Sequence, residues 1–112
     1  MAIPIDRERV RDSLKEWASE EDQRRLWLSD GANGAEVSSF VEARESLFTD
    51  TGLALDLDRG RIVFDSTADA MLKKLDMLIS QIDANQAPNQ IIADDQMREV
   101  RQLASTLLRL VR

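Results

Sequence analysis

The residues of this chain that could do chemistry are mainly carboxylates, and four of them lie close together in the sequence. Asp56 and Asp58 form an Asp-x-Asp pair, with Asp50 before it and Asp65 after it. Carboxylate oxygens are suitable ligands for a hard divalent cation. The spacing lacks the glycine and the final glutamate of a calcium-binding loop. A solvated acidic edge is therefore the favoured interpretation, and a metal-dependent or carboxylate-based enzyme is a remote alternative.

Other groups on which enzymes commonly rely are missing from the sequence. The 112 residues include no histidine, no cysteine and no tyrosine. This removes the usual general base near neutral pH and the thiol nucleophile. Ser19, Ser39 and Ser66 are better explained as helix caps than as nucleophiles, although a serine–lysine pair stays formally open. We therefore expect a protein that is not an enzyme and that needs no cofactor.

The negative charge of the chain is concentrated in its middle third. The net charge is −6, and residues 31–66 contribute −4 of it, with seven acidic side chains against three basic ones. Nucleic-acid binding needs a positively charged surface that neutralises the phosphates. We therefore expect no nucleic-acid partner, and instead a protein partner with a basic face.

Hydropathy gives no sign of a membrane segment or a signal peptide. No apolar run approaches the roughly 18 residues that would indicate a spanning helix. Residues 6–9 are all charged, where a signal peptide would need an apolar stretch. The sequence therefore predicts a cytoplasmic protein with no membrane partner.

Apolar residues recur every three or four positions in five segments, most of them preceded by a capping residue. The predicted helices cover about residues 7–18, 20–29, 40–51, 67–82 and 94–111. The expected caps of the first four are Asp6, Ser19, Ser39 and Ser66. Residues 85–90, which contain Pro88, are expected to form a loop. These elements predict an all-α fold, an irregular antiparallel bundle of about five helices in one domain, residues 1–112.

Two structures compete for residues 53–64. Leu53, Leu55 and Leu57 alternate with polar or small residues, and residues 61–64 are apolar and partly β-branched. This pattern is typical of a small β-hairpin with a turn at residues 58–60. A short helical turn ending at Gly60 fits equally well, because leucine, alanine and aspartate also occur in helices.

The run Leu26-Trp27-Leu28 raises the question of a binding surface. Successive helical residues point about 100° apart, so three large apolar side chains in a row cannot all face one core. Either this helix lies between two layers or one of the three is exposed. Tryptophan is enriched at binding hot spots, but the favoured interpretation is that Trp27 fills the core together with Trp17.

The C-terminal helix is apolar around most of its circumference. Leu107, Leu108, Leu110 and Val111 together exceed the roughly 100° stripe of a one-sided helix. Such a helix is either central in the fold or part of a subunit contact. Leu108, Leu110 and Val111 are therefore candidates for self-association in a homodimer.

The leading hypothesis is a non-catalytic protein-interaction module with an acidic surface. A small inhibitor or an immunity-type protein that binds a basic partner would be one concrete form of it. A homo-oligomeric protein that associates through its C-terminal helix is the alternative. The candidate partner-binding residues are Trp27, Glu36, Glu42, Glu45, Asp50, Asp56 and Asp58.

Overall fold

Helices are the regular elements of the computed structural model, which describes residues 5–29, 31 and 37–111. They are α1 (Arg7–Ala18), α2 (Glu20–Trp27), α3 (Phe40–Arg44), the π-helical turn η2 (Glu45–Thr49), α4 (Leu53–Asp58), α5 (Ser66–Ser80), α6 (Pro88–Ala93) and α7 (Asp95–Leu110). The predicted all-α class is confirmed, with more and shorter helices than the sequence indicated. In the part of the chain that is described, no helix has both the length and the apolar character to cross a bilayer.

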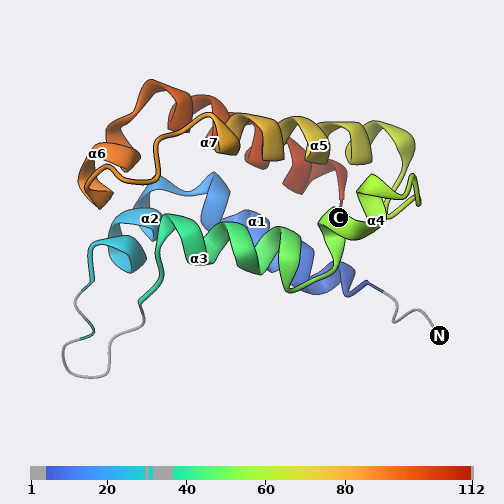
Figure 1. The fold of residues 1–112 in the computed structure, drawn as a ribbon, viewed down its shortest axis with the longest axis horizontal. Coiled ribbons are helices and arrows are strands. Elements are labelled where there is room, and N and C mark those ends of the chain that lie inside the picture. Colours follow the sequence, from blue (N-terminus) through green and yellow to red (C-terminus); the bar gives the residue numbers. More distant parts are fainter. Residues whose placement is uncertain (1–4, 30, 32–36, 112) are drawn as a thin grey trace.

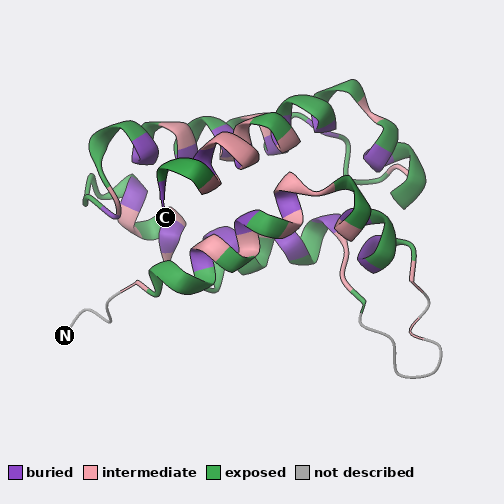
Figure 2. Ribbon diagram, turned by 180° about the vertical axis from the view of Figure 1, so that it is seen from behind, coloured by how far each residue is buried: buried purple, intermediate pink, exposed green. Residues whose placement is uncertain are grey.

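The helices form two layers (Figure 1). One layer holds α5, α6 and α7, and the other holds α1, α2, α3 and η2. Helix α7 is central, since it packs against α1 in the opposite layer and against α5 in its own. Val10 and Leu14 on α1 are fully buried, as are Val100 and Leu107 on α7. Figure 2 shows buried residues on the helices of both layers, and together they make one core.

Three of the predicted helix caps are confirmed, and the fourth is wrong by one residue. The side chains of Asp6, Ser19 and Ser39 accept hydrogen bonds from backbone amides in the first turns of α1, α2 and α3. Helix α5 is capped by Asp65, whose carboxylate accepts a 2.7 Å bond from the Ala68 amide, and Ser66 is its first residue. A charged carboxylate is a stronger acceptor than a hydroxyl at the positive end of a helix.

The hairpin alternative for residues 53–64 is wrong, and the helical alternative is the one observed. Residues 53–58 form α4, in which Leu53 and Leu57 are buried while Leu55 is 53% exposed. A strand would have turned all three leucines to the same side. In the helix, the i, i+4 pair faces the core and the leucine between them points outward.

The segment after α4 is held by side chains and not by a neighbouring strand. The carboxylate of Asp69 on α5 accepts hydrogen bonds from the amides of Val63, at 2.7 Å, and Phe64, at 3.0 Å. The Arg7 side chain donates to the Val63 carbonyl at 2.6 Å. These bonds satisfy backbone groups that a hairpin would have paired with a second strand.

The predicted loop at residues 85–90 is wrong in its second half, where α6 begins at Pro88. Proline favours the first position of a helix, because its fixed φ angle is helical and its missing N–H is not needed there. The Gln90 side chain accepts a hydrogen bond from the Ala87 amide at 3.2 Å. Burial of Ile91 and Ile92 then fixes the short helix on the core.

Candidate functional site

The predicted acidic surface follows α3, η2 and α4. Glu42, Glu45, Asp50 and Asp58 are exposed, whereas Asp56 is half-buried and forms a 3.6 Å ion pair with Arg61. Glu36 lies outside the described residues. Four of the six acidic residues predicted to bind a partner therefore have exposed side chains.

The aspartates considered as metal ligands have separate roles or positions. Asp65 caps α5, Asp56 pairs with Arg61, and Asp50 and Asp58 point to solvent. Among the described residues, no three or more carboxylates are grouped closely enough to hold a metal ion together.

Trp27 lies in the core, as the favoured interpretation of the sequence had it. It is 5% exposed and makes edge-to-face contacts with Trp17 and Phe40, at centroid distances of 5.6 and 6.0 Å. Its indole N–H donates a 2.8 Å hydrogen bond to the Glu16 carboxylate, which also accepts one from the Ser38 hydroxyl at 3.0 Å. The exposed member of the apolar run is its neighbour, Leu28.

A groove with an aromatic floor lies between the two layers, beside these rings. It consists of two adjoining cavities of about 350 and 100 Å³, both lined by Phe40, Val41 and Ala84. We call it the aromatic groove. Its further lining residues are Arg44, Glu45, Phe48, Thr49, Ala54 and Asp76 in the larger part, and Trp27, Ser39, Gln86, Pro88 and Ile91 in the smaller.

The packing of the helices explains why the groove exists. Helix α3 and η2 pack against α1, while α5 packs against α7. The ion pair between Arg44 on α3 and Asp76 on α5, at 3.1 Å, brings these two outer elements together beside the groove.

The π-helical turn contributes to the groove wall. The Asp50 amide bonds to the Glu45 carbonyl at 2.8 Å, five residues back, so this turn is wider than an α-helical one. Leu47 and Phe48 are both buried, although they are neighbours. Phe48 lines the groove, whereas Leu47 does not.

The groove combines buried aromatic rings, a half-exposed aliphatic side chain and charged groups at its wall. Trp27, Phe40 and Phe48 are almost fully buried and form the floor, while Val41 is 49% exposed. Glu45 contributes a carboxylate to the wall. In the sequence, the wide apolar face of residues 40–48 is the one sign of this site. The residues across the groove, such as Ala84, show no pattern that could have identified it.

The three residues predicted to support self-association differ in how far their side chains are exposed. Leu110 is 48% exposed, Leu108 is partly buried against the core, and Val111 is 2% exposed. Only Leu110 among the three offers a largely open side chain. Association through the C-terminal helix stays a prediction.

Comparisons of the chain with protein-family models, with curated proteins and with solved structures found no significant match.

Proposed function

We propose that this protein is a non-catalytic interaction module whose aromatic groove receives an amphipathic, basic helix of a partner protein. The observation that carries the proposal is the groove itself, where a half-exposed valine and buried aromatic rings lie beside carboxylates. Helix-in-groove recognition uses such a surface, with apolar anchors entering the groove and charged residues at its rim.

The charge proposed for the partner rests on Glu45 in the groove wall and on two carboxylates near it in the sequence. Glu42 and Asp50, on either side of Glu45 in the sequence, are exposed and have no ion-pair partner among the described residues. Lysines or arginines beside the apolar anchors would be attracted to these carboxylates, which speeds association and selects partners. An inhibitor or immunity-type protein acting on a basic target in the cytoplasm is one concrete form of this function.

The smaller cavity is the expected position of the main anchor. It is lined by Trp27, Phe40 and Ile91, all at most 5% exposed, and by the rim residue Val41. Side chains that enter a desolvated pocket near the centre of an interface provide most of the binding free energy. We therefore expect one leucine or phenylalanine of the partner to occupy it.

Calorimetry with a synthetic leucine–lysine amphipathic helix tests this function. The parent protein is expected to bind it with an affinity that falls as salt is added, because exposed charges are screened. Val41→Asp is expected to weaken binding by about tenfold or more, since it places a charge where an apolar anchor enters. Glu45→Lys is expected to weaken it less, by a few-fold, in line with one exposed ion pair.

Two matched variants control for general effects of charge. Ile62→Asp changes an apolar side chain that is 66% exposed outside the groove, and Glu99→Lys reverses an exposed charge on α7. Both should bind the peptide like the parent. Failure of the parent to bind it, or equal losses in Val41→Asp and Ile62→Asp, would contradict the proposal.

A further inference from the structure

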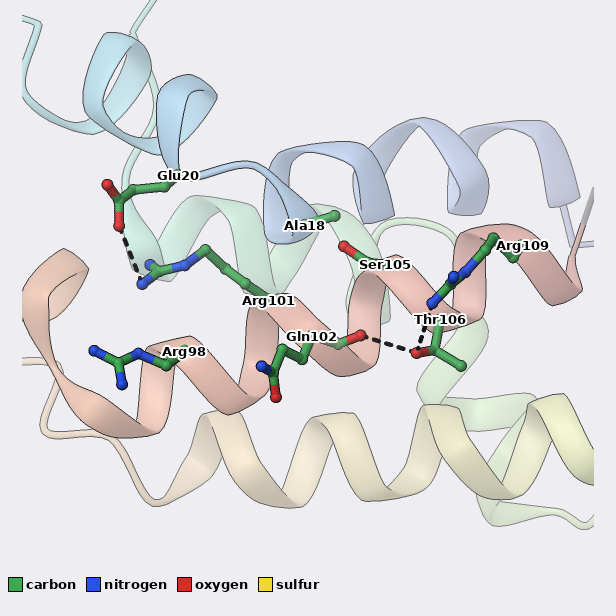
Figure 3. Close-up of a pocket in the computed structure, with 8 residues that line it drawn as sticks. All are labelled: Ala18, Glu20, Arg98, Arg101, Gln102, Ser105, Thr106 and Arg109. Carbon is green, nitrogen blue, oxygen red and sulfur yellow. Dashed lines mark hydrogen bonds and ion pairs between the residues drawn. The ribbon is translucent and has the colours of Figure 1, made fainter.

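A second groove is lined by arginines and by none of the residues predicted from the sequence to support partner binding or self-association. It is an open hollow of about 620 Å³ between α7 and the junction of α1 with α2 (Figure 3). We call it the arginine groove. Its lining residues are Ala18, Glu20, Arg98, Arg101, Gln102, Ser105, Thr106 and Arg109.

The α7 side chains of this groove form one face of the helix. Counted from Arg98, the other five lie 3, 4, 7, 8 and 11 positions further along α7, all sums of three and four, which places the six on one side of the helix. At 1.5 Å per residue, Arg98 and Arg109 are about 16 Å apart along the helix axis. The groove therefore presents a row of hydrogen-bond donors with positive charge at both ends and in the middle.

The groove is lined by more positive than negative side chains, although the chain as a whole is acidic. Glu20 is its only lining carboxylate, and Glu20 pairs with both Arg24 and Arg101, at 3.3 Å each. Arg98 has no ion pair or side-chain hydrogen bond within the described part of the chain, and Arg109 makes only a 3.5 Å bond to the Thr106 hydroxyl. Two guanidinium groups are thus free to bind an anion.

The middle arginine is held in place by buried groups. The Arg101 side chain is 14% exposed, and it donates to the Gln23 amide oxygen at 3.0 Å and to the Ile92 carbonyl at 3.1 Å. Gln23 is itself fully buried and donates to the carbonyls of Glu16 and Trp17. Burial lowers the pKa of Arg101, and Glu20 opposes that shift. A fixed guanidinium loses little conformational entropy when it binds a ligand.

We propose that the arginine groove binds the acidic face of a helix in a partner protein. Arginine matches carboxylates in two-point hydrogen bonding, and glutamates repeated on one face of a helix would meet the row on α7. Single-stranded nucleic acid fits less well, because no aromatic side chain lines this groove to stack on a base. A longer polyanion would also meet the exposed Asp95 and Glu99, close to Arg98 on the same helix.

Fluorescence anisotropy with two labelled alanine-based peptides tests the inference. In the first, glutamates have the spacing of residues 98, 102, 105 and 109, so that they share one helical face. In the second, the same glutamates are distributed around the helix. The parent protein is expected to bind the first peptide at least about tenfold more tightly at low salt.

A pair of double variants locates the binding. Arg98→Glu with Arg109→Glu changes two exposed residues of the groove, and it is expected to weaken binding of the first peptide by at least about tenfold. Arg9→Glu with Arg59→Glu makes the same change in net charge at exposed positions outside the groove, and it should bind within about twofold of the parent. Circular dichroism checks that both double variants are folded. If the first is not, Arg98→Ala with Arg109→Ala replaces it, with a smaller loss expected.

Three results would overturn the inference. The first is equal binding of the two peptides by the parent protein. The second is an equal loss of binding in the two double variants. The third is tighter binding of an oligothymidylate of about ten nucleotides than of the first peptide, which would favour nucleic acid. The aromatic groove is not involved in any of these measurements, so their failure leaves the proposed function standing.

Discussion

At the scale of single residues, the buried polar side chains bond to helix ends and to the segments between helices. Gln23, Thr51 and Asp69 are the buried polar residues of the described chain, and no buried side-chain nitrogen or oxygen within it lacks a partner. Each of the three bonds to backbone groups at the end of a helix or in a loop. Burial of such groups is costly unless they are hydrogen-bonded, so these contacts specify the fold locally.

Asp69 provides the sharpest test at this scale. Asp69→Ala would leave the amides of Val63 and Phe64 without acceptors in a largely buried region. We expect a loss of about 2–4 kcal/mol in the free energy of unfolding, the cost of two unsatisfied donors. Urea denaturation followed by circular dichroism measures it. Asp65→Ala, which removes an exposed cap, should cost only about 1 kcal/mol, and equal midpoints for Asp69→Ala and the parent would rule out the assigned role.

Residue types and local spacing could predict some of these roles and not others. Asp6, Ser19 and Ser39 were predicted as caps because a cap and the helix it starts are neighbours in the sequence. The role of Asp69 could not be predicted. Its carboxylate accepts hydrogen bonds from the amides of Val63 and Phe64 only because the segment between α4 and α5 folds back over the start of α5. The arginine groove was missed for a similar reason, because it combines α7 with the junction of two helices about 80 residues earlier.

At the scale of elements, long periodic segments were predictable and short ones were not. The apolar spacing in residues 67–82 and 94–111 predicted α5 and α7 with errors of only a few residues. Helices α4 and α6 have six residues each, too few for the helical period to be distinguished from alternation or a loop. What decides their structure is tertiary packing, namely the burial of Leu53, Leu57, Ile91 and Ile92.

The packing of α5 against α7 is tested by truncating one core residue. Ile79 is fully buried on α5, so Ile79→Ala should lower the free energy of unfolding by about 2–5 kcal/mol through lost apolar contact and the cavity left behind. Met77→Ala on the same helix, at a side chain that is 53% exposed, should change it by about 0.5 kcal/mol or less. Thermal or chemical denaturation of both variants distinguishes the two positions. Similar stabilities for the two would mean that α5 faces the core with a different side.

At the scale of the whole molecule, two grooves differ in the chemistry of the side chains that line them. The aromatic groove lies between α3–η2 and the α5–α6 region, and the arginine groove lies beside α7 and the α1–α2 junction. Charge clustering predicts an acidic surface in the middle third of the chain, and this stays a prediction. The arginine groove could not be predicted in this way, because residues 67–112 balance in charge. Only the helical face on which the arginines of α7 gather makes that region basic.

The binding position of the leucine–lysine peptide on this molecule is the most direct measurement of the central claim. Amide chemical shifts of the isotope-labelled protein would be followed during titration with the peptide. The largest changes are expected in residues 37–49, at Ala54, at Asp76 and in residues 84–91, which form or flank the aromatic groove. Changes centred on residues 98–109 instead, or spread evenly over the protein, would contradict the claim that the aromatic groove is the binding site.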